Sequence, residues 1–257
     1  MNEDEPKPAP APAGPKSGGA DADKDMGGGI LGVLRTWGPP ILAVLFIRAF
    51  IFEPFRIPSG SMVPTLLIGD QVVVYKSAYG VWLPFTNVEL VDLGDPERGD
   101  IIVFEYPKNP SDNYIKRVVG IPGDRISVAD NRITLNGVPQ PVIQHPSGPT
   151  FDYEDDTCRK RPMKHWEEDL SGVRHTILTS GFGSGPDRSE IVVPDDHVFV
   201  MGDNRDNSED SRSWGFVRYD QIKGKAHIVW MSWWSCTGAY GSIRGDRLFH
   251  SLYGEPP

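Results

Sequence analysis

Residues 30–52 form an almost uninterrupted apolar stretch that limits where the rest of the chain can lie. As a helix this stretch would rise about 34 Å, against a hydrocarbon slab of ~30 Å, so it is long enough to cross a bilayer. Arg35 and Arg48 lie near its ends, from where their side chains can reach the headgroups. Proline suits a first turn, so we expect the regular helix to start at Pro40. No small-residue cleavage motif follows, so we predict an uncleaved transmembrane anchor.

The segments on either side of this stretch differ in composition. Residues 1–29 are rich in Pro, Ala, Gly, Lys and Asp and have almost nothing apolar to bury, so we predict a disordered tail. Lys24 and Arg35 lie on the amino side and Arg56 on the other, a slight bias toward an inner tail and an exported carboxyl domain. We assign residues 53–257 to that domain.

The sequence of residues 53–257 has the pattern of a mostly β protein. With 28 Gly and 24 Pro, about a fifth of the chain favours turns over long helices. Short β-branched runs alternate with turn signals such as Pro122-Gly123-Asp124 and Asn136-Gly137. We therefore predict antiparallel strands at 71–79, 101–106, 114–121, 125–128, 132–135, 191–201 and 223–233. Residues 140–188 have an irregular order of Pro, Gly, Asp and Lys and are expected to be an insertion with little core of its own.

Charge and cysteine content exclude several classes of function. A formal net charge of -9 argues against a nucleic-acid partner. Cys158 and Cys236 match no zinc or redox spacing, and no two histidines lie three to five positions apart. We expect no metal and no cofactor. A disulfide between the two cysteines and a pair of free thiols both remain open.

Two serines, Ser59 and Ser61, follow directly after the apolar stretch. A serine hydroxyl is a weak nucleophile and needs a base within hydrogen-bond reach. Lys116 lies in an apolar run and is a candidate base. A lysine must lose about 3.4 pKa units to be half neutral at pH 7, which burial can supply. The alternative, an exposed lysine on a half-buried strand, stays open.

Residues 202–212 form a dense polar run after an apolar segment. Counted from Asp203, a calcium loop would need glycine at the sixth position and glutamate at the twelfth, but Ser208 and Trp214 stand there. The run is either a solvated turn or a rigid scaffold beside a site.

Four segments together resemble the motifs of bacterial type I signal peptidases. They are Ser59 to Leu66, Tyr114-Ile115-Lys116-Arg117, Gly120 to Asp124 and Gly202 to Arg212. The resemblance implies a serine endopeptidase with a Ser/Lys dyad on a mostly antiparallel β fold, which removes signal peptides from exported preproteins after small residues. It also implies a protein of the bacterial inner membrane, with the bilayer as a partner and the catalytic domain on the periplasmic side. Many members of the family carry a second membrane span, which we do not find in this sequence, so we expect a single-pass protein.

The resemblance gives individual residues a role. Ser61 is similar to the nucleophile and Lys116 to the general base. Ser59 matches the hydroxyl that, with the Ser61 backbone N–H, holds the developing oxyanion, and Ser208 matches the hydroxyl that orients Lys116. Three further residues of the polar run match a structural support beneath the site, the last two as an ion pair: Asp203, Asp210 and Arg212.

Five apolar residues match positions that form shallow pockets for small substrate side chains, namely Ile57, Pro58, Met62, Leu66 and Ile115. Small pockets exclude bulky side chains by overlap. Packing in the hydrophobic core is the alternative role for all five.

Two other classes of function remain. Self-cleaving Ser/Lys proteases of bacterial repressors share the dyad chemistry, but they carry a DNA-binding module, for which residues 1–29 have neither a helical pattern nor a basic patch. A non-catalytic, anchored β domain that binds export partners would use the serines only in structural turns.

Overall fold

The computed structural model describes residues 30–82, 89–155, 157–181, 185–234 and 241–253. The chain divides into two compact units, Met1–Leu45 and Phe46–Pro257. The predicted disordered tail, residues 1–29, lies outside the described residues.

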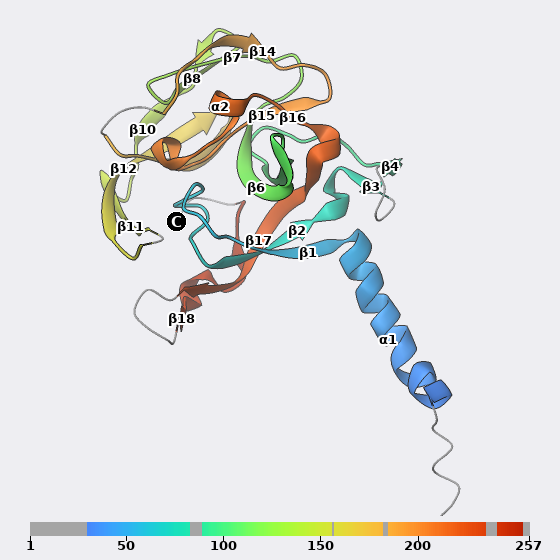
Figure 1. The fold of residues 1–257 in the computed structure, drawn as a ribbon. Coiled ribbons are helices and arrows are strands. Elements are labelled where there is room, and N and C mark those ends of the chain that lie inside the picture. The colour runs from blue at the N-terminus through green and yellow to red at the C-terminus, as the bar shows by residue number, and fades with distance from the viewer. Residues whose placement is uncertain (1–29, 83–88, 156, 182–184, 235–240, 254–257) are drawn as a thin grey trace, which may run out of the picture. The chain divides into compact units, whose positions relative to one another are not determined.

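The apolar stretch forms helix α1, Ile30–Phe50 (Figure 1). The helix begins ahead of Pro39 and Pro40 and continues through both, so the expected start at Pro40 is wrong. In the described part of the chain, no helix combines the length and the mean hydropathy that crossing a membrane requires. The predicted transmembrane span is therefore not shown.

The second unit is built on one large antiparallel sheet (Figure 1). Its order is β1 (Phe52–Arg56), β2 (Asp70–Tyr75), β17 (Ile222–Trp234), β5 (Ile101–Tyr106), β6 (Asn109–Gly120), β15 (His197–Met201) and β16 (Val217–Arg218). The short strands β18 (Ser242–Ile243) and β19 (His250–Ser251) also pair with β17. The predicted mostly β fold with antiparallel pairing is confirmed.

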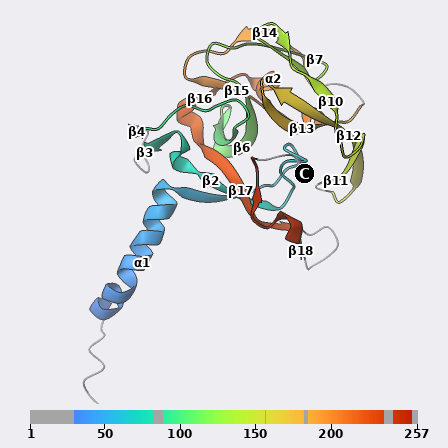
Figure 2. The same cartoon turned by 180° about the vertical axis from the view of Figure 1, so that it is seen from behind.

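Three smaller antiparallel sheets complete the unit (Figure 2). One has the order β14 (Arg188–Val192), β7 (Arg125–Ala129), β8 (Arg132–Leu135) and β9 (Val138–Pro139). The second, here called the outer sheet, places β12 (Lys160–Leu170) between β10 (Val142–Gln144) and β11 (Thr150–Glu154), with β13 (Val173–Thr179) also paired to β12. The third pairs β3 (Gly80–Trp82) with β4 (Glu89–Asp92).

Short helical turns connect the strands. They are η1 (Lys76–Ala78), η2 (Arg205–Asn207), α2 (Ser211–Trp214), η3 (Tyr219–Gln221) and η4 (Gly245–Arg247).

Each predicted strand region contains a strand, and two of them end differently from the expectation. The predicted strand 71–79 stops at Tyr75 because η1 follows. The predicted strand 191–201 is two strands, β14 and β15, separated by a turn in which Asp196 has a φ of 56°. Such a positive φ is typical of turns and interrupts the extended backbone.

The outer sheet was not expected, since 140–188 has no apolar alternation. The structure explains this, because the buried positions of β12 include the polar residues His165 and Glu168. The segment also has a small core, in which Tyr153, Met163 and Leu178 pack with Val63. In the same segment Cys158 is disulfide-bonded, while Cys236 lies outside the described residues.

Residues 57–69, which connect β1 to β2, pack against both the large sheet and the outer sheet (Figures 1 and 2). Ile57, Met62 and Leu66 belong to the cluster of buried side chains that covers the large sheet. Val63 instead belongs to the cluster of the outer sheet, where Gly60 also faces Tyr153. The fold therefore holds the serine-containing connection between two sheets.

Candidate active site

Ser61 and Lys116 are in contact. Lys116 lies in the buried half of β6, and its Nζ is 2.7 Å from Ser61 Oγ and 3.1 Å from the carbonyl oxygen of Ile115. Both side chains are buried, with exposed fractions of 8% for Ser61 and 4% for Lys116. The two groups, 55 positions apart in the chain, thus form a hydrogen-bonded pair shielded from water.

Burial determines the acidity of the lysine. Removal of the amine from water lowers the pKa of Lys116 to about 8, because desolvation disfavours the cation. The carboxylates of Asp210, Asp203 and Glu209 act in the opposite direction, and the Arg212 guanidinium acts with burial. Lys116 is therefore partly neutral at neutral pH, which a base requires.

Asn204 fixes the backbone that carries Ser61. Its backbone N–H donates to the carbonyl oxygen of Ser61 at 3.1 Å, and its side-chain Nδ2 donates to the carbonyl oxygen of Gly60 at 3.0 Å. Asn204 is fully buried and also bridges to Leu178 of β13. This role of Asn204 was not predicted from the sequence.

Gly202 allows the polar run to approach the serine connection closely. A Cβ built at this glycine would lie 2.5 Å from the carbonyl oxygen of Ser61 and 2.3 Å from Ser208 Oγ. Neither distance is compatible with a side chain, so only glycine fits here without displacing Ser61.

Asp203 connects the two segments that carry the pair. Its carboxylate accepts hydrogen bonds from Arg117 Nε at 2.8 Å, Arg117 Nη2 at 2.7 Å and Thr65 Oγ1 at 2.5 Å. Arg117 follows Lys116 in β6, and Thr65 lies four residues after Ser61. Burial alone would raise the pKa of Asp203, but the Arg117 guanidinium lowers it, so the carboxylate stays charged.

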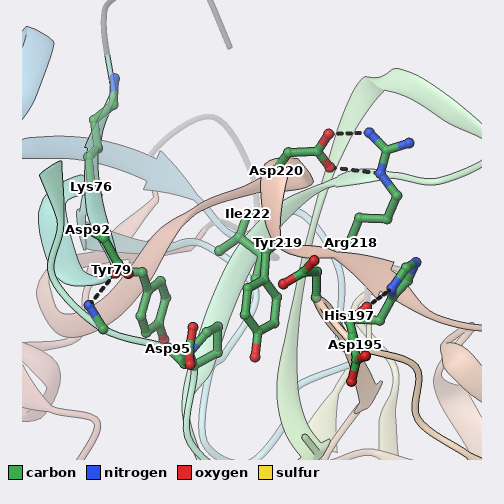
Figure 3. Close-up of a pocket in the computed structure, with 13 residues that line it drawn as sticks. Lys76, Tyr79, Asp92, Asp95, Asp195, His197, Arg218, Tyr219, Asp220 and Ile222 are labelled. Atoms are coloured by element: carbon green, nitrogen blue, oxygen red, sulfur yellow. Dashed lines mark hydrogen bonds and ion pairs between the residues drawn. The ribbon is translucent and has the colours of Figure 1, made fainter. Parts of the chain in front are cut away.

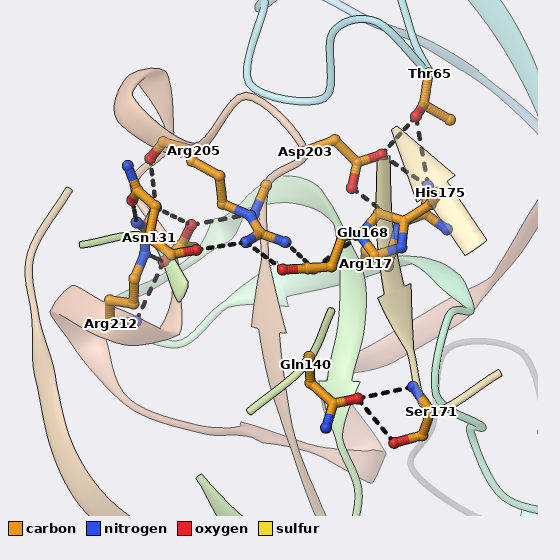
Figure 4. A network of polar contacts seen from close by, with 12 residues as sticks. Thr65, Arg117, Asn131, Gln140, Glu168, Ser171, His175, Asp203, Arg205 and Arg212 are labelled. Carbon is orange, nitrogen blue, oxygen red and sulfur yellow. Dashed lines mark hydrogen bonds and ion pairs between the residues drawn. The ribbon is translucent and has the colours of Figure 1, made fainter. Parts of the chain in front are cut away.

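Further buried ion pairs extend this network to the outer sheet (Figure 4). Arg212 donates to Asp210 from Nε and Nη2, both at 2.8 Å, and also to the carbonyl oxygen of Arg205 at 2.6 Å. Arg205 in turn donates to both carboxylate oxygens of Glu168 in β12. Charge-assisted, two-point contacts of this kind fix geometry as well as charge. The ion pair Asp210–Arg212 that the resemblance implies is present; Glu168 and Arg205 were not singled out from the sequence.

The two other hydroxyls assigned from the resemblance, those of Ser59 and Ser208, make weaker contacts or none with Ser61 and Lys116. Ser59 is exposed, and its Oγ is 3.5 Å from Ser61 Oγ, the outer limit of a hydrogen bond. Ser208 Oγ is buried and makes no hydrogen bond of standard geometry to a described residue, although it is close enough to Asp210 to contribute to the lowered pKa of that carboxyl. The structure does not join Ser208 to Lys116.

The five apolar candidates for substrate contact fall into two groups. Four of them, Ile57, Met62, Leu66 and Ile115, belong to the buried cluster of the large sheet, whereas Pro58 is exposed. Core packing therefore describes the first four in this structure. Their role in substrate pockets stays a prediction.

A separate cavity of about 530 Å³ is lined by Lys76, Tyr79, Asp92, residues 94–96, 195–197 and 218–220, and Ile222 (Figure 3). Neither Ser61 nor Lys116 lines it. Within the ranges that the structure describes, no group of three His, Cys, Asp or Glu side chains could hold a metal ion.

A buried serine hydroxyl within hydrogen-bond reach of a base, here a lysine amine of lowered pKa, is an arrangement that can activate the serine as a nucleophile. A family model described as signal peptidase, peptidase S26, matches residues 30–233. The chain belongs to this family and is a serine peptidase, a hydrolase that acts on peptide bonds.

Relatives support the assignment. A signal peptidase I of Pseudomonas fluorescens is 42% identical over 212 residues, which cover 77% of this chain and 72% of the relative. One of Pseudomonas aeruginosa is 41% identical over 214 residues, with the same coverage. A solved signal peptidase I structure from Enterococcus faecalis is 25% identical and covers 52% of this chain and 98% of its own, with a TM-score of 0.32. That score is too low to compare the two folds.

Proposed function

We propose that this peptidase removes N-terminal signal peptides from exported preproteins, with Ser61 as nucleophile and Lys116 as general base. The observation that carries the proposal is the 2.7 Å contact between Lys116 Nζ and Ser61 Oγ, in a place where burial lowers the pKa of the amine. The names of the relatives, signal peptidase I, supply the substrate class.

The proposed reaction has two halves. Neutral Lys116 accepts the Ser61 hydroxyl proton while Oγ attacks the carbonyl carbon of the scissile bond, and the proton then passes to the leaving amine as the C–N bond breaks. In the second half a water attacks the acyl carbon while Lys116 takes its proton. The bond between the acyl carbon and Ser61 Oγ then breaks, the carboxylic acid product leaves, and Lys116 returns the proton to Ser61 Oγ. Ser59 and the Ser61 N–H are the proposed donors to the oxyanion.

The proposed specificity for small residues rests on the resemblance and on the crowding near Ser61. Ile57, Met62, Leu66 and Ile115 already fill the space beside the serine connection. A substrate side chain that binds against them must be small, because close-packed side chains yield little volume.

The pH dependence of cleavage tests the proposal. With a pKa of about 8, about one Lys116 in ten is neutral at pH 7, so kcat/KM for a purified preprotein should rise nearly tenfold per pH unit below pH 7 and level off above pH 8 to 9. The measurement is single-site cleavage followed by mass spectrometry of the new amino terminus. An active enzyme whose rate rises only near pH 10 would contradict the buried base, and no cleavage at any pH would contradict the function.

We also propose that the protein attaches to a bilayer through α1, with its catalytic unit on the exported side of a bacterial inner membrane. The support is that α1 exposes large apolar side chains, including Trp37, Leu42 and Leu45. Burial of such side chains in lipid is favourable, whereas a charge among them is costly.

Flotation with liposomes tests this attachment. The full-length chain should float with vesicles, and the double variant Leu42→Glu, Leu45→Glu should stay in the dense fractions while its cleavage of a short soluble peptide is retained. A matched variant of the catalytic unit, Glu190→Gln, should float like the wild type. Flotation of the double variant would show that α1 is not the attachment.

A further inference from the structure

The aromatic side chains beside Lys116 form a layered wall. Lys116 Nζ lies 5.4 Å from the centre of the Tyr114 ring, which comes from the same face of β6. The Tyr106 ring stacks on Tyr114, with ring centres 4.4 Å apart and planes 2° from parallel. Trp214 meets Tyr106 edge to face at 5.9 Å. The wall covers one side of the amine and contributes to its removal from water.

An acidic residue holds the outer layer of this wall. The Tyr106 hydroxyl donates to Glu209 Oε1 at 3.0 Å. Glu209 lies between Ser208 and Asp210 in the polar run, so this bond connects the wall to the loop that supports the site. The contact is exposed, unlike the ion pairs beneath the site.

Glu209 differs from the other carboxylates that act on Lys116. Asp203 is neutralised by Arg117 and Asp210 by Arg212, both in buried pairs. Among the described residues no cation pairs with Glu209, whose hydrogen bond is to a neutral phenol. Its charge is therefore the uncompensated one among the carboxylates that favour the Lys116 cation.

We propose that Glu209, held in place by Tyr106, is a positioning residue that sets how much of Lys116 is neutral at physiological pH. This inference deepens the proposed function and rests on it. Each buried ion pair is neutral as a whole, although Asp210 and Asp203 favour the Lys116 cation more strongly than Glu209 does. Burial and the wall disfavour the cation, because they exclude water from the amine. The single exposed carboxylate opposes these effects and, because water and salt reach it, makes the acidity of the base depend on ionic strength.

The variant Glu209→Gln isolates the charge. Glutamine keeps an oxygen that can accept the Tyr106 hydrogen bond, so the wall should stay closed while the negative charge is lost. The acid limb of the kcat/KM profile should then move to lower pH by about 0.2 to 0.7 unit, the range typical of exposed charge pairs. At pH 7 this is a gain of roughly 1.5- to 4-fold in kcat/KM.

The salt dependence of this shift distinguishes an electrostatic role of Glu209 from a merely structural one. The shift between wild type and Glu209→Gln, measured in 0.1 M salt, should be mostly lost in 1 M salt, where charges are screened within about 3 Å. Glu190→Gln is the matched control, because it removes one exposed carboxylate that pairs with Arg125 and does not act on Lys116. It should leave the profile unchanged.

Tyr106→Phe tests the hydrogen bond. Without the phenol, Glu209 is free to move into water, so the shift caused by Glu209→Gln should be less than half as large in the Tyr106→Phe background. Such a cycle isolates the coupling between the two residues.

The outcomes are distinguishable from a failure of the proposed function. If the wild type cleaves preproteins and Glu209→Gln has an unchanged acid limb, or a shift that persists in 1 M salt, the inference is overturned and the function stands. A full shift in the Tyr106→Phe background would overturn the role of Tyr106. If the wild type cleaves no preprotein at any pH, the function itself fails.

Discussion

Replacement of Ser61 by alanine is expected to reduce kcat/KM for preprotein cleavage by at least about 10³-fold. The hydroxyl is the proposed attacking group, and among the described residues no other hydroxyl is hydrogen-bonded to Lys116 Nζ. Lys116→Ala should cause a loss of similar size, because the serine keeps its position but has no base. The double variant should be no worse than either single variant, since the two residues act as a unit.

Two matched variants make this result interpretable. Ser213→Ala and Lys108→Ala change the same residue types at exposed positions, and both should retain wild-type rates. Circular dichroism should show that all variants are folded. A serine-directed acylating probe should label wild-type Ser61 and fail to label Lys116→Ala at neutral pH. Retained cleavage in Ser61→Ala or Lys116→Ala would remove the dyad from the mechanism.

The second large effect is expected from Asp203→Ala, and it concerns stability. The substitution leaves the Arg117 guanidinium buried without its carboxylate and also removes the acceptor of the Thr65 hydroxyl. Loss of one partner of a buried ion pair typically costs about 3 to 5 kcal/mol. For a unit of this size that corresponds to a fall in Tm of roughly 6 to 20 °C. Thermal unfolding followed by circular dichroism measures it.

An exposed ion pair supplies the comparison. Asp220 pairs with Arg218 at the surface, where water and salt screen both charges, so Asp220→Ala should leave the Tm nearly unchanged. If Asp203→Ala were as stable as Asp220→Ala, the buried network would not hold the two segments together as described.

The proposed reacting groups could be named from the sequence because their chemistry restricts residue type. A nucleophile and a base must be particular side chains, and Ser61 and Lys116 stand in recognisable segments. Five strands of the large sheet, β2, β5, β6, β15 and β17, were predictable because short β-branched runs between turn signals mark them. The other strands of this sheet, β1, β16, β18 and β19, were not predicted. The transmembrane span, by contrast, is not shown.

The supporting contacts were harder to predict because they depend on position in space. Asn204 acts partly through its backbone N–H, a group that almost every residue has. The contact between Glu168 and Arg205 joins residues 37 positions apart, one of them in a strand that buries polar as well as apolar side chains. No local sequence pattern indicates that two such distant residues pair.

Three consecutive residues of the polar run reach three different parts of the unit. Asp203 contacts Arg117 beside the base, Asn204 contacts the backbone at Ser61, and Arg205 contacts Glu168 in the outer sheet. These partners are separated by 86, 143 and 37 positions, so the contacts form only after most of the chain has been synthesised and has docked. A nascent or half-folded chain therefore lacks these contacts around Ser61 and Lys116. We expect the proposed peptidase activity to appear only in the last stages of folding.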